Sequence, residues 1–405
     1  MTIISLFSGI FCREDSLTGK IAGSTGYELV KDIDIIHGAS KETGISENKI
    51  ERAFFSRTSI FNKFTHERER SLAHLKLALA EKIPEDNLII DGFTGQLLPE
   101  NLNHVLKICL IADMKSRIAL AMEKESISES EAGKIIKKTD EDRAAWIGSI
   151  YKKSDPWDSS LYDVVIPTDK MADEEIIGLV EKVLNKDVLK FTETTEKALA
   201  DFKLAAQIEA ALTREGHNVE VKADEGDITL TINKNVLMLS RLEEELKNIA
   251  SKIPGVKKVE TTVGPGFHQA DIYRKYDFEM PSKVLLVDDE REFVQTLSER
   301  LLMRDMGSAV AYDGESALEL IREDEPEVMI LDLRMPGIDG IEVLKRVKAT
   351  QPDIEVIILT GHGSEADKEV CMKLGAFAYL HKPVDIDELS EKIKQANEKI
   401  QNKKA

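Results

Sequence analysis

The sequence is short of cysteine. Its 405 residues include three cysteines, Cys12, Cys109 and Cys371, which lie far apart and form no Cys-x-x-Cys pair. Each stands next to apolar residues, so we expect buried free thiols rather than disulfides. The eight histidines form no cluster with the cysteines and no His-x-x-x-His motif, which argues against a structural zinc site.

Long apolar runs are absent as well. No stretch reaches the roughly 20 apolar residues that a transmembrane helix needs. The apolar start, residues 1–11, lacks a basic segment and runs directly into Arg13, Glu14 and Asp15. It is therefore interpreted as a buried first strand rather than a signal peptide. We expect a cytoplasmic protein without a membrane span.

Basic residues are in deficit. The chain has 55 lysines and arginines against 74 acids, which gives a formal net charge of −19. General nucleic-acid binding needs a basic face that attracts phosphates, so this balance argues against it, although a local basic patch stays compatible with the sequence. The length indicates more than one domain.

The last third of the sequence carries four short apolar runs that end in polar groups. The first run, in KVLLVDDE, ends at Asp288 and Asp289, and the second, in VMILDLRMPGIDG, ends at Asp332. Two later runs end at Thr360 and just before Lys382. The carboxyl ends of parallel strands share one edge of a sheet, where ligands bind. Three acids, a hydroxyl and an ammonium group should therefore converge, a set that suits a hard cation and a phosphoryl group.

Strand and helix patterns alternate five times between residues 283 and 400. The paired acids, the later Asp, the Met-Pro-x-x-x-Gly turn, the Thr and the Lys-Pro follow one another in order. This block resembles the response-regulator receiver family, which implies a doubly wound (βα)5 fold. The resemblance makes Asp332 the phosphoacceptor. It also implies that Asp288, Asp289, Asp332 and the backbone carbonyl of Arg334 hold Mg²⁺.

The resemblance assigns roles to three further residues. Lys382 would neutralise the phosphoryl oxygens, Thr360 would hydrogen-bond the phosphoryl group, and Tyr379 would follow as an aromatic switch. The metal has a physical reason, because two like charges 4 Å apart repel by about 4 kcal/mol at an effective dielectric constant of 20. The implied partner is a sensor histidine kinase or a phosphotransfer protein. A homodimer through the last helices is also considered.

The first block, residues 1–186, alternates strands and helices and predicts a parallel α/β sheet. The segment Asp91-Gly-Phe93 and the polar run from Arg117 to Asp169 resemble the cytidylate-kinase-like family. The resemblance implies a nucleotide, ATP or CMP, as a ligand. Lys20, Asp91, Arg117 and Arg143 are the candidate nucleotide-binding residues.

This block lacks the phosphate-binding loop that such a kinase needs. The motif Gly-x-x-x-x-Gly-Lys-Ser/Thr is matched only at Gly19-Lys20, and Glu14 stands where its first glycine should be. Glu14 and Asp15 place negative charge where phosphates should sit. Solvated side chains or structural ion pairs are therefore the favoured interpretation of the four candidates. A receiver-gated nucleotide kinase, a nucleotide-binding module and a scaffold all remain open.

Residues 187–266 form a third, smaller block. A helix over 198–214, strands over 219–222 and 228–232, a helix over 239–253 and a strand over 256–263 predict an αββαβ unit. With its Pro254-Gly255-Val256 segment, the block resembles the BON family. A linker is expected over 267–282 and the receiver over 283–400. The predicted protein is multidomain α/β, with a kinase-like parallel sheet, a small α+β domain and a doubly wound receiver.

Overall fold

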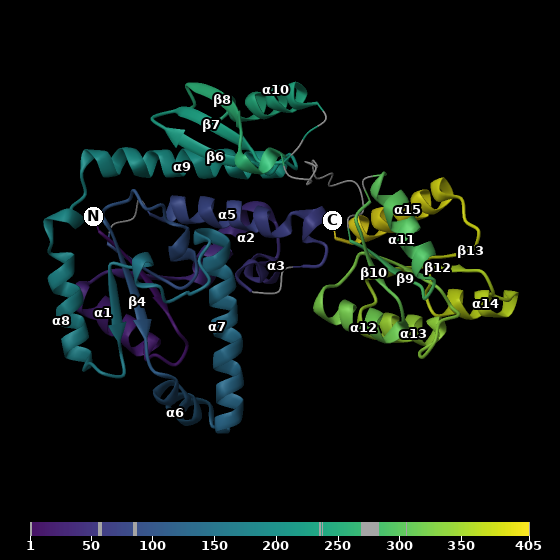
Figure 1. Cartoon of the computed structure of the whole chain (residues 1–405), viewed down its shortest axis with the longest axis horizontal. Coiled ribbons are helices and arrows are strands. Elements are labelled where there is room, and N and C mark those ends of the chain that lie inside the picture. Colours follow the sequence, from purple (N-terminus) through teal and green to yellow (C-terminus); the bar gives the residue numbers. More distant parts are fainter. Residues whose placement is uncertain are drawn as a thin grey trace. The chain divides into compact units, whose positions relative to one another are not determined.

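The computed structural model describes residues 2–55, 59–83, 87–234, 236, 238–268, 283–304 and 306–404. The chain forms two compact units: residues 1–58 with 67–274, and residues 59–66 with 275–405. Figure 1 shows both by colour along the chain. Most of the predicted linker, residues 269–282, lies outside the described residues.

A parallel five-stranded sheet forms the centre of the first unit. Its strand order is β2-β3-β1-β4-β5, so β1 is the middle strand. The register places Ile3 opposite both Leu88 and Val105. The strands are β1 (Ile3–Ser8), β2 (Glu28–Lys31), β3 (Leu88–Asp91), β4 (Val105–Ile111) and β5 (Val164–Pro167). Every residue of β1 is buried, as expected for a strand that is covered on both faces.

Helices cover both faces of this sheet. Alternate residues of β1 enter two separate cores: Ile3 and Phe7 pack with α2, α5 and α7, whereas Ile4 and Leu6 pack with α1 and α8. This follows from the two-residue period of a strand. The helices are α1 (Glu14–Thr25), α2 (Asp32–Thr43), α3 (Glu47–Glu51), α5 (Glu67–Lys82), α6 (Met114–Glu125), α7 (Glu129–Tyr151) and α8 (Asp173–Leu184).

The αββαβ block belongs to the same compact unit. Its elements are α9 (Glu193–Arg214), β6 (Glu220–Asp224), β7 (Asp227–Ile232), α10 (Leu239–Ala250) and β8 (Lys258–Val263). β7 pairs antiparallel with β6 and parallel with β8. On its other side α9 packs on α5, where Leu77 and Ala80 meet Ala206 and Ala210. The three alanine side chains are small, which lets the two helices approach closely.

The structure corrects several predicted boundaries. The sequence reading missed β2, a four-residue edge strand in which only Val30 is buried. α9 begins at Glu193, earlier than predicted, where Thr192 accepts a hydrogen bond from the backbone N–H of Thr195 as N-cap. β5, at the edge of the sheet, includes Pro167 as its last residue. An edge strand tolerates the missing N–H of proline.

The second unit contains the predicted (βα)5 fold. Its parallel strands lie in the order β10-β9-β11-β12-β13. They are β9 (Val284–Val287), β10 (Ser308–Ala311), β11 (Val328–Leu331), β12 (Glu355–Thr360) and β13 (Ala378–His381). The helices are α11 (Arg291–Leu302), α12 (Gly314–Glu323), α13 (Gly340–Thr350), α14 (Glu365–Lys373) and α15 (Ile386–Lys404). α11 and α15 cover one face, and α12, α13 and α14 the other (Figure 1).

Residues 59–66 also belong to the second unit. They include the short helix α4 (Asn62–Thr65). The Ser59 hydroxyl donates a 2.6 Å hydrogen bond to Asp324, and the Phe61 side chain is fully buried. Among the described residues of the whole chain, no helix has the length and apolarity to cross a membrane.

The start of α13 tests how tightly the receiver fold is packed. A Cβ on Gly340 would lie 2.1 Å from the Asp332 carbonyl oxygen and 2.7 Å from the Leu333 Cα, and both are backbone atoms that cannot rotate away. Gly340→Ala should lower the free energy of unfolding of this unit by about 1–3 kcal/mol in denaturant titrations. Gly178→Ala, in α8 with nothing within 4 Å, should instead gain roughly 0.5–1 kcal/mol. Equal changes in the free energy of unfolding for the two variants would contradict the close packing around Gly340.

Candidate functional site

Three carboxylates meet at the carboxyl edge of the receiver sheet. Val287 and Leu331, the last residues of β9 and β11, are register partners, so the residues that follow them are neighbours. Carboxylate oxygens of Asp288, Asp289 and Asp332 lie within 4.8 Å of one another. Asp288 and Asp332 are buried, whereas Asp289 is exposed. The structure thus brings together the three acids that the sequence selected.

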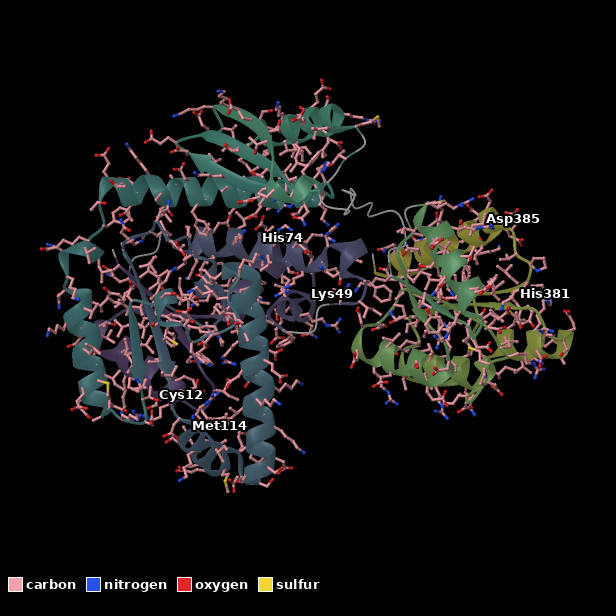
Figure 2. All side chains as sticks on the ribbon, in the orientation of Figure 1. Cys12, Lys49, His74, Met114, His381 and Asp385 are labelled. Atoms are coloured by element: carbon pink, nitrogen blue, oxygen red, sulfur yellow. The ribbon has the colours of Figure 1, made fainter. Side chains whose placement is uncertain are left out.

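Lys382 enters this cluster from the residue after β13. Its Nζ atom lies 2.7 Å from Asp288 Oδ2 and 3.8 Å from Asp332 Oδ2. Figure 2 labels His381, the last residue of β13. Lys382 is the next residue in the sequence. The lysine is the cation that the sequence predicted, and in this conformation it is closer to Asp288 than to the expected phosphoacceptor.

Sequence reasoning missed two other partners of Lys382. Glu290 Oε1 lies 2.9 Å from Nζ, and the Phe293 ring centroid lies 4.5 Å from it. Glu290 directly follows the paired acids, so its proximity to the site was readable from the sequence. Phe293 lies in the first turn of α11, and its contact with Lys382 could not be predicted without knowing where that helix begins.

Thr360 and Tyr379 lie together beside the cluster. Thr360 is fully buried at the end of β12 and accepts a 3.3 Å hydrogen bond from the His362 N–H. A Cβ built on Gly363 would lie 1.7 Å from the Tyr379 hydroxyl oxygen and 2.9 Å from Thr360 Cγ2, which places these side chains side by side. Within the described chain, no hydrogen bond joins Thr360 to the three acids. The side chain of Arg334 is 65% exposed and approaches Asp367 at 3.7 Å.

The electrostatics of this cluster suit a divalent cation. Burial raises the pKa of Asp288 above its ordinary value, although Lys382 opposes the shift. Burial alone would lower the pKa of Lys382, but its hydrogen bonds to Asp288 and Glu290 raise it. Carboxylate oxygens are the ligands that Mg²⁺ prefers. Asp288, Asp289 and Asp332 together could therefore hold a Mg²⁺ ion.

The corresponding edge of the first unit gathers two of the predicted arginines. Arg117, in α6, donates two 2.8 Å hydrogen bonds to Asp140 and one to the Ile10 carbonyl. Arg143, in α7, donates to the Ser8 carbonyl and lies over the Phe93 ring. Burial lowers the pKa of Arg143 from its ordinary value. Both guanidinium groups thus face the loop that follows β1.

That loop binds a carboxylate from its own chain. The Glu14 side chain accepts hydrogen bonds from the backbone N–H groups of Phe11 at 3.0 Å and Cys12 at 2.7 Å. Glu14 is the first residue of α1, so its charge also lies at the positive end of the helix. Figure 2 labels Cys12 in this loop. Burial raises the pKa of the Cys12 thiol to about 11, so the thiol is protonated at neutral pH.

The other two predicted residues bind different partners. Lys20 lies 2.5 Å from Asp173 at the start of α8, and no contact with the other three candidates is found in the described part of the chain. Asp91 ends β3 close to Asp32, whose carboxylate accepts hydrogen bonds from the Phe93 and Thr94 N–H groups. The sequence reading missed Asp32, Asp140 and Asp173, which are far from their partners along the chain and carry no local motif.

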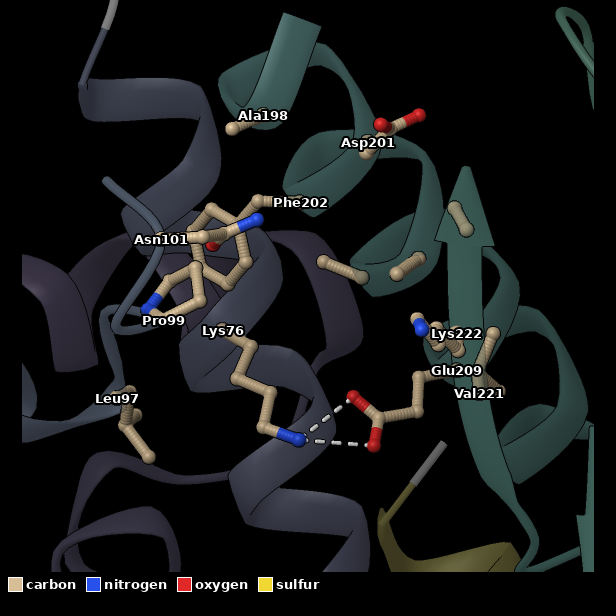
Figure 3. Close-up of a pocket in the computed structure, with 13 residues that line it drawn as sticks. Lys76, Leu97, Pro99, Asn101, Ala198, Asp201, Phe202, Glu209, Val221 and Lys222 are labelled. Atoms are coloured by element: carbon tan, nitrogen blue, oxygen red, sulfur yellow. Dashed lines mark hydrogen bonds and ion pairs between the residues drawn. The ribbon is translucent and has the colours of Figure 1, made fainter. Parts of the chain in front are cut away.

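A separate cavity of about 250 Å³ lies between α5, α9 and β6 in the first unit. Figure 3 shows Phe202 beside it and Lys76 reaching toward Glu209. Lys76 Nζ lies 2.8 Å from one Glu209 carboxylate oxygen and 2.9 Å from the other. Lys76 and Glu209 thus neutralise each other at the wall of this cavity, which Asp201 and Lys222 also line.

Comparison with known proteins finds a family match in each of two regions of the chain. A family model described as Response regulator receiver domain matches residues 284–394. Sporulation initiation phosphotransferase F of Bacillus subtilis (strain 168) is 35% identical over 116 residues, which are 29% of this chain and 94% of that protein. The chain belongs to the response regulator receiver family. Proteins of this family bind Mg²⁺ for phosphorylation and interact with sensor histidine kinases or phosphotransfer proteins.

Other relatives are similar to the receiver over part of their length. The transcriptional regulatory protein CpxR of Escherichia coli (strain K12) is 42% identical over 113 residues, 28% of this chain and 48% of that protein. The chain thus spans about half the length of such curated relatives. The crystal structure of the Francisella response regulator 1452 receiver domain is 34% identical, with a TM-score of 0.28, and covers 29% of this chain and 98% of that one.

The N-terminal block has its own match. A model of the Cytidylate kinase-like family matches residues 3–170. The predicted receiver and the predicted resemblance to cytidylate kinases are therefore confirmed. The BON resemblance stays a prediction, although the αββαβ order on which it rested is present.

The Asp91 carboxyl leads to a pH-dependent prediction. Burial, and then the nearby Asp32, raises its pKa to about 7 from an ordinary value of 3.8. Between these two pH values the folded chain keeps a proton that the unfolded chain loses, so this group's contribution to stability falls as pH rises. Asp91→Asn should remove this loss of stability at rising pH, because the amide does not ionise. At pH 8 it should gain on the order of 1–4 kcal/mol, with less gain at pH 4.5.

Urea titrations of the full chain at pH 4.5, 6 and 8 measure this difference. Glu174→Gln, which removes an exposed acid in the first turn of α8, is the control and should show no comparable gain. A gain for Asp91→Asn that is the same at all three pH values would contradict a raised pKa.

Proposed function

We propose that this protein is a response regulator of a two-component phosphorelay that is phosphorylated on Asp332 in the presence of Mg²⁺. The observation that carries the proposal is the cluster of Asp288, Asp289 and Asp332 within 4.8 Å, with Lys382 beside it. The phosphorylated receiver would signal to the cytidylate-kinase-like block and to the BON-like block of the same chain.

Asp332 is suited to act as the nucleophile. One of its oxygens accepts a 2.8 Å hydrogen bond from the Leu333 N–H, which fixes the carboxylate plane, and Oδ2 faces Lys382. A carboxylate oxygen attacks the phosphorus of the donor. A new O–P bond forms while the bond to the leaving group breaks, and acetate departs when the donor is acetyl phosphate. Lys382 balances charge on the transferred group.

Bound to the acids, Mg²⁺ would offset their mutual repulsion and that of the incoming phosphoryl oxygens. Asp288, Asp289, Asp332 and the Arg334 backbone carbonyl are the proposed ligands. Thr360 is the proposed hydrogen-bond donor to the phosphoryl group and Tyr379 the proposed switch. Their adjacency at Gly363 supports this pair, because a shift of the Thr360 side chain changes the space that the Tyr379 ring occupies.

Phosphorylation by a small donor tests the proposal. The full chain with acetyl phosphate and Mg²⁺ should gain the mass of one phosphoryl group in intact-protein mass spectrometry. Asp332→Asn should abolish the gain, because the nucleophilic carboxylate is lost, and chelation of Mg²⁺ should reduce it by at least tenfold. Asp353→Asn removes an exposed acid elsewhere in the receiver and should leave the gain unchanged. An unmodified wild type would refute the proposal.

A receiver-gated cytidylate-type kinase is the second candidate function, and the family match over residues 3–170 favours it. Two contacts weigh against it. Glu14 occupies the N–H groups of the loop after β1, where a phosphate would need them, and Asp140 occupies Arg117. We therefore infer that the block is a kinase-derived module with a degenerate phosphate-binding loop rather than an active transferase.

Removing the Glu14 carboxylate tests this inference. Glu14→Ala frees two N–H donors and removes a negative charge, so ATP binding measured by calorimetry on the full chain should tighten by roughly tenfold. Asp15→Ala removes the same charge without freeing the N–H pair, and should tighten binding less. Phosphoryl transfer from ATP to CMP by the wild type, lost in Arg143→Ala, would instead establish the kinase.

A further inference from the structure

The ammonium group of Lys382 is shared unequally among three carboxylates. Its Nζ atom lies 2.7 Å from Asp288 and 2.9 Å from Glu290, but 3.8 Å from Asp332. The two short contacts are hydrogen-bonded ion pairs, and the third is longer than a hydrogen bond. Lys382 is therefore held by residues of the β9–α11 segment rather than by the acid at the end of β11.

Glu290 differs from the other two acids in its exposure. Its side chain is 65% exposed, whereas those of Asp288 and Asp332 are 6% and 7% exposed. Glu290 precedes α11, and Phe293 in the first turn of this helix lies under the ammonium group at 4.5 Å. The start of α11 thus contacts Lys382 through both a charge and an aromatic ring, at the rim of the acidic cluster.

We propose that Glu290 is a positioning residue that holds Lys382 toward the rim and away from Asp332, and so slows phosphorylation of the receiver. The inference rests on the proposed phosphorylation of Asp332. A phosphoryl group on Asp332 carries about −1.5 to −2 charges and needs the lysine as its counter-ion. To reach it, the lysine must leave one of its present partners, and the exposed Glu290 is the one outside the buried cluster.

The expected effect is modest, because water and salt screen an exposed ion pair. Glu290→Gln should raise the rate of phosphorylation by acetyl phosphate about two- to fivefold, and the gain should shrink as salt is added. Glu290→Asp keeps the charge at the rim and should stay within about twofold of the wild type. Glu292→Gln removes a nearby exposed acid of α11 and should leave the rate unchanged.

A double-mutant cycle separates positioning from simple repulsion of the donor. If Glu290 acts through the lysine, Glu290→Gln should have no effect on the rate in a Lys382→Ala background. If Glu290 only repels acetyl phosphate, the same gain should appear in both backgrounds, and this result would overturn the inference. Equal rates for the wild type and Glu290→Gln would overturn it too.

The same four proteins can also be compared by their affinity for Mg²⁺. This affinity is measured from the rise in melting temperature during a Mg²⁺ titration. The effects of Glu290→Gln and Lys382→Ala on this affinity should not add, because both act on one ion pair, and additive effects would overturn the inference. This measurement needs no phosphorylation. A wild type that gains no phosphoryl group would refute the proposed function, while the Mg²⁺ cycle would still decide the positioning role.

Discussion

The fold of the receiver unit holds three carboxylates close together, and their mutual repulsion must be offset by positive charge. The register of β9 against β11 makes residues 288 and 332 neighbours, so the acids cannot separate without breaking the parallel ladder. Asp288 and Asp332 are also buried, which removes the water that would otherwise screen them. Lys382 supplies one positive charge, which is fewer than the three negative charges that the carboxylates can carry. A cation bound at this edge would offset the negative charge that the fold leaves uncompensated.

At the carboxyl edge of the first unit's sheet, several polar groups are already bound by side chains of the same chain. Its sheet also ends in a loop and two arginines, and these groups have partners from the same chain. Glu14 binds the loop N–H groups, Asp140 binds Arg117, and the Phe93 and Thr94 N–H groups bind Asp32. These pairs need no external ligand. The loop after β1 and Arg117 are thus paired within the chain, whereas burial raises the pKa of the neighbouring Asp32 and Asp91.

The sequence alone predicted the residues at the edge of the receiver sheet better than those of the first unit. The receiver acids directly follow the wholly apolar strands β9 and β11, and Thr360 and Lys382 stand at the ends of two further strand-like runs. Strand position and side-chain chemistry could therefore be predicted together. Asp32, Asp140 and Asp173 bind Phe93, Arg117 and Lys20, which are 61, 23 and 153 residues away along the chain. No local pattern marks such pairs. β2 was missed for a related reason, because an edge strand with one buried residue has no apolar run to reveal it.

The packing of α9 bears on how a signal could pass along the chain. Leu77 and Ala80 of α5 meet Ala206 and Ala210 of α9, and the ion pair of Lys76 with Glu209 joins the same two helices. Small side chains leave little room for sliding, so the αββαβ block and the N-terminal sheet should behave as one body. Residues 59–66 belong to the receiver unit although residues on both sides of them belong to the other. The chain therefore passes from one unit to the other at three points in the sequence, so three covalent connections join the two units rather than one linker.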